Sequence, residues 1–141
     1  MKTALCSAAG VIGGAIASAL GGWDLAVKTL LFLAAADFFS GWITATVFHA
    51  SPKTESGAYA SRVGLKGLMR KIMMFVFVAI GSRMDQMLGA NYLRDAIVIG
   101  FAVNEILSIV ENAGLMGLPL PKVITKALDV LAQKADGPAD N

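Results

Sequence analysis

The sequence predicts an all-α integral membrane protein with three to four transmembrane helices, a C-terminal amphipathic surface helix and a homo-oligomeric assembly. Apolar residues make up 56% of the 141-residue chain, and the mean hydropathy of +0.66 lies above the usual range of soluble domains. The charged residues, 16% of the chain, gather in short islands between apolar runs. Some apolar runs also contain polar side chains that lipid cannot satisfy, which predicts contacts between helices or between copies.

The composition speaks against several other classes of protein. Cys6 is the only cysteine, so no intrachain disulfide is possible, and a single histidine, His49, leaves no ligand set for zinc. The formal net charge is only +2, and the basic residues flank apolar segments without aromatic residues between them, so nucleic acid is not an expected partner. We therefore expect no enzyme activity, no cofactor and no metal.

Residues 1–134 are expected to form one membrane domain, whose first span covers about 4–22. This segment carries no charge and is long enough to cross about 30 Å of hydrocarbon. Lys2 and the small residues 17–19 also fit a secretory signal, so removal of residues 1–19 is an alternative.

The second predicted span covers 25–49. Its only deep charge is Asp37, because Lys28 lies near one end and its long side chain can reach the interface. The connection 50–71 begins with Pro, Ser and Gly residues and continues as a basic helix start. It predicts a loop followed by an interfacial segment.

The third predicted span, about 70–92, is the weakest, because its uncharged run ends at Ser82 and is followed by Arg83 and Asp85. The favoured interpretation is a helix that continues past this pair, with both side chains facing the protein interior. The alternative is a short helix that thins the bilayer.

The fourth predicted span covers 96–116, and Pro119 and Pro121 prevent its continuation. Residues 122–134 place apolar side chains on one face and charged side chains on the other, which predicts an amphipathic helix on the membrane surface. The tail, 135–141, is expected to be disordered.

The basic residues predict the topology. They concentrate in the connection between the second and third spans, which the positive-inside rule places in the cytoplasm. Four spans then place both termini in the cytoplasm as well. The basic residues expected to mark this cytoplasmic loop are Arg62, Lys66, Arg70 and Lys71.

Small residues recur every four positions in the first span, and so share one face of the helix. Such a face lets another helix approach closely, which is how helices associate where lipid removes the hydrophobic driving force. The sequence leaves open whether the partner belongs to the same chain or to another copy. The residues of this helix-packing face are Gly10, Gly14, Ser18 and Gly22.

Polar faces are predicted on the second and fourth spans, where they would line a pore or an oligomer contact. On the second span, residues at i, i+3, i+4 and i+7 share a face: Asp37, Ser40, Gly41 and Thr44. On the fourth span, five polar residues fall in a sector about 120° wide. These five residues are Asn104, Glu105, Ser108, Glu111 and Asn112.

The fourth span is marginal in lipid by itself. Its large apolar residues contribute about −5 kcal/mol to insertion, and two Glu at about +2.5 to +3 kcal/mol each cancel that gain. Arg83 or Lys28 is a candidate partner for one carboxylate. The deep carboxylates Asp37, Glu105 and Glu111 nevertheless outnumber the cations at similar depth, so we expect self-association or protonation.

These residues alone leave three classes of function open. Polar faces from several copies can surround a pore. An intramembrane carboxylate can instead titrate in a small, oligomeric proton- or cation-coupled transporter. In a passive scaffold, the polar groups would only hold helices together.

Over residues 30–125 the chain resembles the toxin-secretion/phage-lysis type of bacteriophage holin. The resemblance rests on four features that occur in order and at matching spacing. They are Asp37 with Gly41; Ser61, Gly64, Gly67, Leu68, Arg70 and Lys71; the Asn-Glu-x-x-Ser-x-x-Glu-Asn run at 104–112; and Gly117, Pro119 and Pro121.

The resemblance implies a protein that accumulates and oligomerises in the cytoplasmic membrane of a bacterium. Such a protein permeabilises the membrane so that an endolysin, or in some relatives a large toxin, leaves the cell. The implied partners are the lipid bilayer, further copies of the chain and the exported protein. No cofactor and no catalysis are implied.

Overall fold

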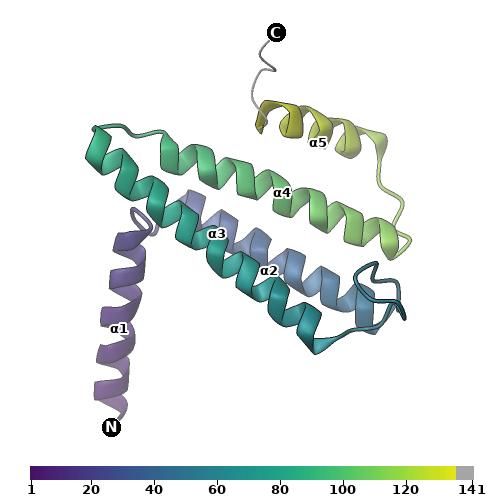
Figure 1. Cartoon of the computed structure of the whole chain (residues 1–141), viewed down its shortest axis with the longest axis horizontal. Coiled ribbons are helices and arrows are strands. Elements are labelled where there is room, and N and C mark those ends of the chain that lie inside the picture. The colour runs from purple at the N-terminus through teal and green to yellow at the C-terminus, as the bar shows by residue number, and fades with distance from the viewer. Residues whose placement is uncertain (136–141) are drawn as a thin grey trace.

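The computed structural model describes residues 1–135 and folds this part of the chain into α-helices without any β-strand. The predicted all-α class is therefore confirmed. Figure 1 shows a bundle of three long helices, a first helix that leaves it, and a last helix that turns back over it. The helices are α1 (Lys2–Ala19), α2 (Leu25–Thr46), α3 (Ser61–Leu88), α4 (Leu93–Leu115) and α5 (Lys122–Ala135).

Two of these helices, α1 and α2, are long and apolar enough to cross a membrane. The spans predicted at 70–92 and 96–116 correspond to most of α3 and to α4, and their crossing of a membrane stays a prediction. The amphipathic segment 122–134 is helical, as expected, and forms most of α5. Of the predicted tail, Ala135 ends α5, and residues 136–141 lie outside the described part of the chain.

Local chemistry explains where several helices begin and end. The side chain of Asp24 accepts a hydrogen bond from the backbone N–H of Val27 at 3.0 Å and so caps the start of α2. Gly89 ends α3 in the left-handed conformation that glycine adopts without strain. Pro119 and Pro121 lie between α4 and α5, as the sequence predicted.

The predicted basic helix start is part of α3, which begins at Ser61, so the basic residues named as a loop lie on the first three turns of a helix. The spacing of four residues between Arg62, Lys66 and Arg70 was itself a helical pattern. Their cytoplasmic location stays a prediction. Because α1 ends at Ala19, Gly22 lies in the following turn with a φ of 118°, and does not extend the small-residue face.

The hydrophobic core lies between α2, α3 and α4. α4 packs on both of the other two helices, whereas α2 and α3 contact each other less. The core residues are Leu20, Val27, Leu30, Ala34, Met74, Val78 and Val98.

α1 stands apart from this bundle and has no buried residue (Figure 1). Within the described residues its only helix contact is with α3, and a Cβ at Gly10 or Gly14 would meet nothing within 4 Å. No helix in the described part of the chain covers the predicted packing face.

α5 packs against α4 (Figure 1). Its Leu128 is buried, whereas Val123, Ile124 and Val130 remain exposed. These apolar side chains are available to a membrane surface, and their location at one stays a prediction.

Candidate polar site between three helices

An ion cluster joins the three helices of the bundle. The Lys71 ammonium group on α3 binds the Asp37 carboxylate on α2 at 2.7 Å and also binds the Glu105 carboxylate on α4. The side chains of Lys71, Asp37 and Glu105 are only 13%, 14% and 7% exposed. One cation therefore serves a half-buried and a buried carboxylate, and each member of the cluster comes from a different helix.

This pairing differs from the one predicted. Arg83 and Lys28, the candidate cations, are both exposed, and Arg83 bonds to Gln86 at 3.3 Å instead. Lys71 was assigned to the basic loop. It lies three and seven residues before the buried Met74 and Val78, so it shares their inward face of α3. This spacing could have identified Lys71 as an inward-facing cation.

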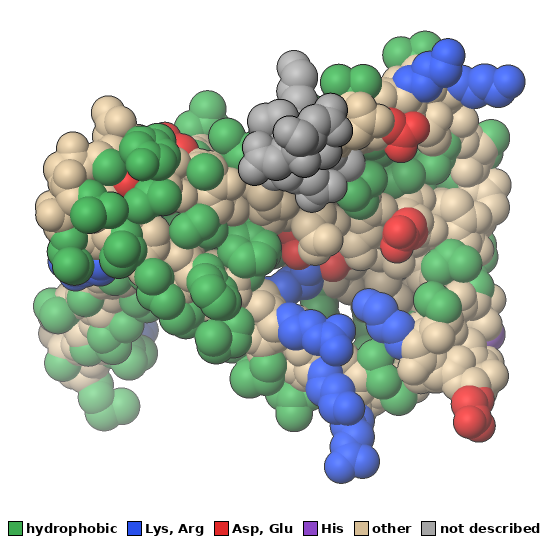
Figure 2. All heavy atoms as spheres, turned by 45° about the horizontal axis from the view of Figure 1, so that its top comes forward, with side chains coloured by type: hydrophobic (Ala, Val, Ile, Leu, Met, Phe, Trp, Pro, Cys, Tyr) green, Lys and Arg blue, Asp and Glu red, His purple; other side chains and the backbone are tan. Residues whose placement is uncertain are grey.

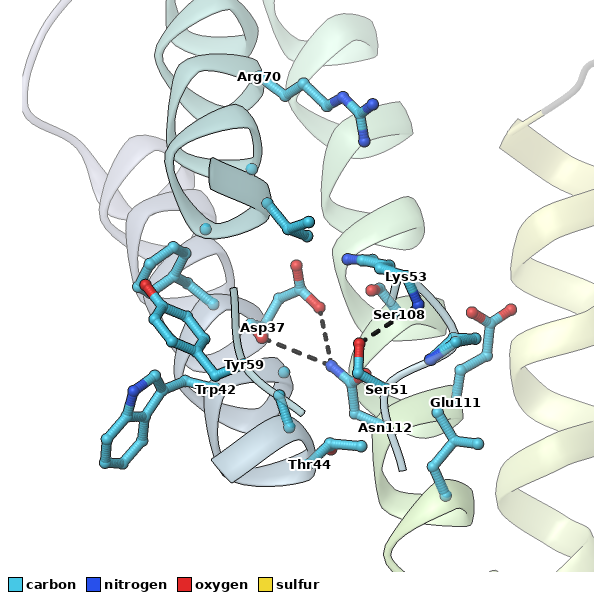
Figure 3. Close-up of a pocket in the computed structure, with 18 of the residues that line it drawn as sticks. Asp37, Trp42, Thr44, Ser51, Lys53, Tyr59, Arg70, Ser108, Glu111 and Asn112 are labelled. Carbon is cyan, nitrogen blue, oxygen red and sulfur yellow. Dashed lines mark hydrogen bonds between the residues drawn. The ribbon is translucent and has the colours of Figure 1, made fainter. Parts of the chain in front are cut away.

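Asn112 forms the second polar contact between α2 and α4. Its side-chain amide donates to Ser40 Oγ at 2.9 Å and to Asp37 Oδ1 at 3.3 Å. Figure 3 shows Asp37 and Asn112 pointing toward one another from the two helices. Gly41 lies beside this amide, since a Cβ there would be in ordinary van der Waals contact with Asn112 Nδ2 at 3.6 Å. The buried Thr44 donates to the Ser40 carbonyl at 2.8 Å.

The predicted polar face of α4 is therefore divided between two environments. Glu105 and Asn112 face α2 and α3, whereas Glu111 is exposed and points away from Asp37 (Figure 3). Asn104 is exposed and Ser108 is half-buried. All five residues line a cavity of about 340 Å³ that the ion cluster also lines.

The α2–α3 loop forms one wall of this cavity, through Ser51, Lys53 and Tyr59 among others (Figure 3). The loop is held by internal hydrogen bonds, including one from Ser51 N–H to the Gly57 carbonyl at 2.9 Å. Gly57 has a φ of 71°, and a Cβ there would lie 1.9 Å from the His49 carbonyl oxygen. Only glycine fits this turn. The sequence predicted a loop in this segment but gave no sign that the loop lines the site.

A second polar cluster lies at the opposite end of the bundle. Arg94, at the start of α4, donates to the Leu20 carbonyl at 2.6 Å and pairs with Asp24 and Asp95, each at 2.9 Å. These bonds attach the α1–α2 turn to α4. The hydrogen bonds from Arg94 and from Val27 N–H lower the pKa of Asp24 below its ordinary value of 3.8.

Asp85 caps the start of α4 from the end of α3. Its carboxylate accepts from the backbone N–H groups of Leu93 and Arg94, both at 3.0 Å. The prediction that Arg83 and Asp85 both face the interior was therefore half wrong, because Asp85 is buried and Arg83 is exposed. The two backbone hydrogen bonds stabilise the buried carboxylate of Asp85. Arg83 has no inward-facing partner among the described residues.

The interactions at the central site are ion pairs and hydrogen bonds. Within the described residues, no group of three or more His, Cys, Asp or Glu side chains is placed to hold a metal ion. Every buried side-chain nitrogen or oxygen in that part of the chain has a hydrogen-bond partner. The bundle therefore satisfies its buried polar side chains within one copy.

Comparison with known proteins agrees with the resemblance noted in the sequence. The model of the bacteriophage holin family matches residues 14–133. An uncharacterized protein of Halalkalibacterium halodurans is 36% identical over 137 residues, which cover 93% of this chain and 96% of that protein. An uncharacterized protein of Listeria monocytogenes is 34% identical over 129 residues, covering 89% and 86% of the two chains.

A phage protein is also similar. The probable holin of Bacillus phage phi105 is 35% identical over 77 residues, which cover 54% of this chain and 57% of that protein. No solved structure matches the chain. The family model covers the end of α1, all of α2, α3 and α4, and most of α5, so it includes the three helices that build the ion cluster. The chain therefore belongs to the bacteriophage holin family.

Proposed function

We propose that this protein is a pore-forming holin that self-associates in the cytoplasmic membrane of a bacterium and permeabilises it. An endolysin, or a protein toxin, would then leave the cell. Family membership and the similarity to a probable phage holin support this proposal. The two helices that are apolar enough to cross a membrane also favour it.

The ion cluster of Lys71, Asp37 and Glu105 is the observation that carries the proposal. A charged side chain in lipid is costly unless it is paired, and the cluster gives Asp37 and Glu105 a shared cation within one copy. The same groups can face water when several copies rearrange around a common opening, because hydration then replaces the internal pairs. The charged groups would thus first be buried within each copy and later exposed to water. Such a sequence would delay permeabilisation of the membrane.

The proposed topology has four spans, α1 to α4, with both termini in the cytoplasm. The basic residues on the first turns of α3 favour a cytoplasmic location for the α2–α3 end of the bundle. At about 1.5 Å per residue, α2, α3 and α4 are each long enough to cross about 30 Å of hydrocarbon.

The proposal is tested by inducible expression in a bacterium, with membrane potential and release of a cytoplasmic enzyme followed over time. We expect an abrupt, late collapse of both. Glu111→Leu should insert but delay or abolish the collapse, because Glu111 is the exposed carboxylate of the polar face. Glu55→Leu removes an exposed carboxylate from the α2–α3 loop and serves as the matched control.

Glu105→Leu should also insert and lose the lesion, because it removes one carboxylate of the ion cluster. Normal lysis by both the Glu105 and Glu111 variants would remove the polar face from the mechanism. Full retention of the enzyme by the wild-type chain at all expression levels would contradict pore formation.

The alternative is a small oligomeric proton- or cation-coupled transporter. A lysine between two carboxylates beside a cavity favours this alternative, because such groups also serve as proton relays in membranes. Reconstituted vesicles distinguish the two functions. Cation uptake driven by a pH gradient, with fluorescent dextran retained at every protein density, would support the transporter and contradict the holin.

A further inference from the structure

The first three turns of α3 carry a row of exposed basic side chains. Arg62, Lys66 and Arg70 recur every four residues, so they share one flank of the helix and lie about 6 Å apart along its axis. Among the side chains that the structure describes, none of these three pairs with a carboxylate. The ion pairs found there involve Lys71 and Arg94. Figure 2 shows Lys and Arg side chains gathered in a column on one face, with hydrophobic side chains on both sides.

The same flank of α3 becomes apolar one turn further along the helix. At about 100° per residue, Met73, Phe77 and Ile80 fall in the same sector as the basic row. These three side chains are 51%, 48% and 48% exposed, so the bundle leaves them accessible. The flank therefore consists of three cations followed by an apolar length of about 10 Å.

The depth of the basic row matches the thickness of a bilayer. About 28 Å of helix separates Asp85, at the far end of the bundle, from Lys66, and the hydrocarbon of a membrane is about 30 Å thick. With Asp85 at one surface, Lys66 lies at the other and Arg62 among the headgroups. Arg70 lies just inside, where its long side chain reaches outward to the phosphates.

We propose that this flank of α3 binds an anionic phospholipid, such as phosphatidylglycerol. Arg62, Lys66 and Arg70 would bind the headgroup, and Met73 and Phe77 would lie along an acyl chain. A headgroup with net negative charge is favoured over a zwitterionic one, because the row has no cancelling carboxylate of its own. The apolar length distinguishes a phospholipid from a free phosphate ion. The inference rests on α3 lying in the membrane and does not require a lesion.

The test uses the full chain reconstituted in phosphatidylcholine vesicles that contain trace spin-labelled phosphatidylglycerol or phosphatidylcholine. The spectra report the fraction of each labelled lipid that is immobilised by the protein. We expect a preference of roughly two- to five-fold for phosphatidylglycerol at low salt, which decreases as sodium chloride is added. The variant Arg62→Gln/Lys66→Gln/Arg70→Gln should have almost no preference.

The matched control is Lys2→Gln/Lys122→Gln/Lys126→Gln, which removes three exposed cations from α1 and α5 and should keep the preference. Far-UV circular dichroism checks that both variants remain helical. A preference that survives in the α3 variant, or that disappears equally in the control, would overturn the inference. The inference would also be overturned if sodium phosphate displaced the labelled phosphatidylglycerol more than sodium chloride does at equal ionic strength, because the site would then bind free phosphate. The assay measures lipid binding and does not depend on leakage. It can therefore be interpreted even if the protein forms no pore.

Discussion

At the scale of single residues, Lys71 is the cation that links the polar faces of α2 and α4 within one copy. The sequence suggested that the carboxylates of Asp37, Glu105 and Glu111 lacked enough cations within one copy. In the structure Lys71 binds the first two, and Glu111 is exposed. Asp37 and Glu105 therefore share one cation within one copy, and the carboxylates still outnumber the cations that pair with them, as the sequence predicted. Self-association remains a proposal that rests on other observations.

The structure predicts that Lys71→Met strongly destabilises the bundle. The carboxylates of Asp37 and Glu105, which are half-buried and buried, would then have no cation, and breaking a buried pair in this way costs about 3–5 kcal/mol. The free energy of unfolding, measured by denaturant titration in detergent micelles, should decrease by that order. The variant Asp37→Asn/Lys71→Met/Glu105→Gln should regain most of the loss, because no charge is left unpaired.

Lys66→Met is the control for this prediction. It removes an exposed cation from the same helix and should change the free energy of unfolding by less than about 0.5 kcal/mol. Equal effects of the two substitutions would show that Lys71 acts through overall charge and not through its pairs.

At the scale of helices, Gly81 and Asp85 near the end of α3 determine how closely α3 and the start of α4 approach. Gly81 lies against the start of α4, since a Cβ there would lie 2.7 Å from Ile97 Cδ1 and 3.0 Å from Arg94 Cα. Asp85 then caps α4 with two backbone hydrogen bonds of 3.0 Å. The close approach and the cap together fix the start of α4, and thereby its rotation toward α2.

Asp85→Ala should therefore loosen the start of α4. Loss of a helix cap costs about 0.5–2 kcal/mol, and the amide protons of Leu93 and Arg94 should exchange faster with solvent. Hydrogen exchange followed by mass spectrometry of the full chain in micelles measures this change. Gln86→Ala removes a neighbouring side chain that bonds only to the exposed Arg83, and should leave exchange in α4 unchanged. Unchanged exchange in the Asp85 variant would show that α4 does not depend on this cap.

At the scale of the whole molecule, two polar clusters lie at different depths with the apolar core between them. Along α2, about 20 Å separates Asp24, which binds Arg94, from Asp37, which binds Lys71. The core residues Val27 and Leu30 lie between these positions. In the proposed topology, the Arg94 cluster would lie near one membrane surface and the Lys71 cluster within the hydrocarbon.

The Arg94 cluster should make the stability of the molecule depend on pH in the acid range. Because the pKa of Asp24 is lowered in the folded state, its contribution is complete above its ordinary pKa of 3.8 and is lost as the pH falls through the lowered value. The melting temperature in micelles should therefore decrease as the pH falls below about 3.8, and this decrease should be smaller in Asp24→Asn. Asparagine keeps the cap of α2, so the comparison isolates the charge.

Asp129→Asn is the matched control, because it neutralises an exposed carboxylate on α5 and should retain the full acid dependence. An identical acid dependence in Asp24→Asn and the wild-type chain would contradict the assignment to Asp24.

The sequence by itself determined the helical class, the apolar character of the segments, the approximate extent of α4 and α5, and the resemblance to holins. It also identified Asp37, Glu105 and Asn112 as members of polar faces. These properties are local, because hydropathy and a period of 3.6 residues belong to a single segment.

Only the tertiary structure decided which groups meet. Lys71 lies 34 residues from both Asp37 and Glu105, and Arg94 lies 70 residues from Asp24. Such pairs depend on how far each helix is rotated about its axis, and one residue changes that rotation by about 100°. The separation of α1 from the bundle likewise reflects packing between helices, which the apolar pattern of α1 alone does not specify.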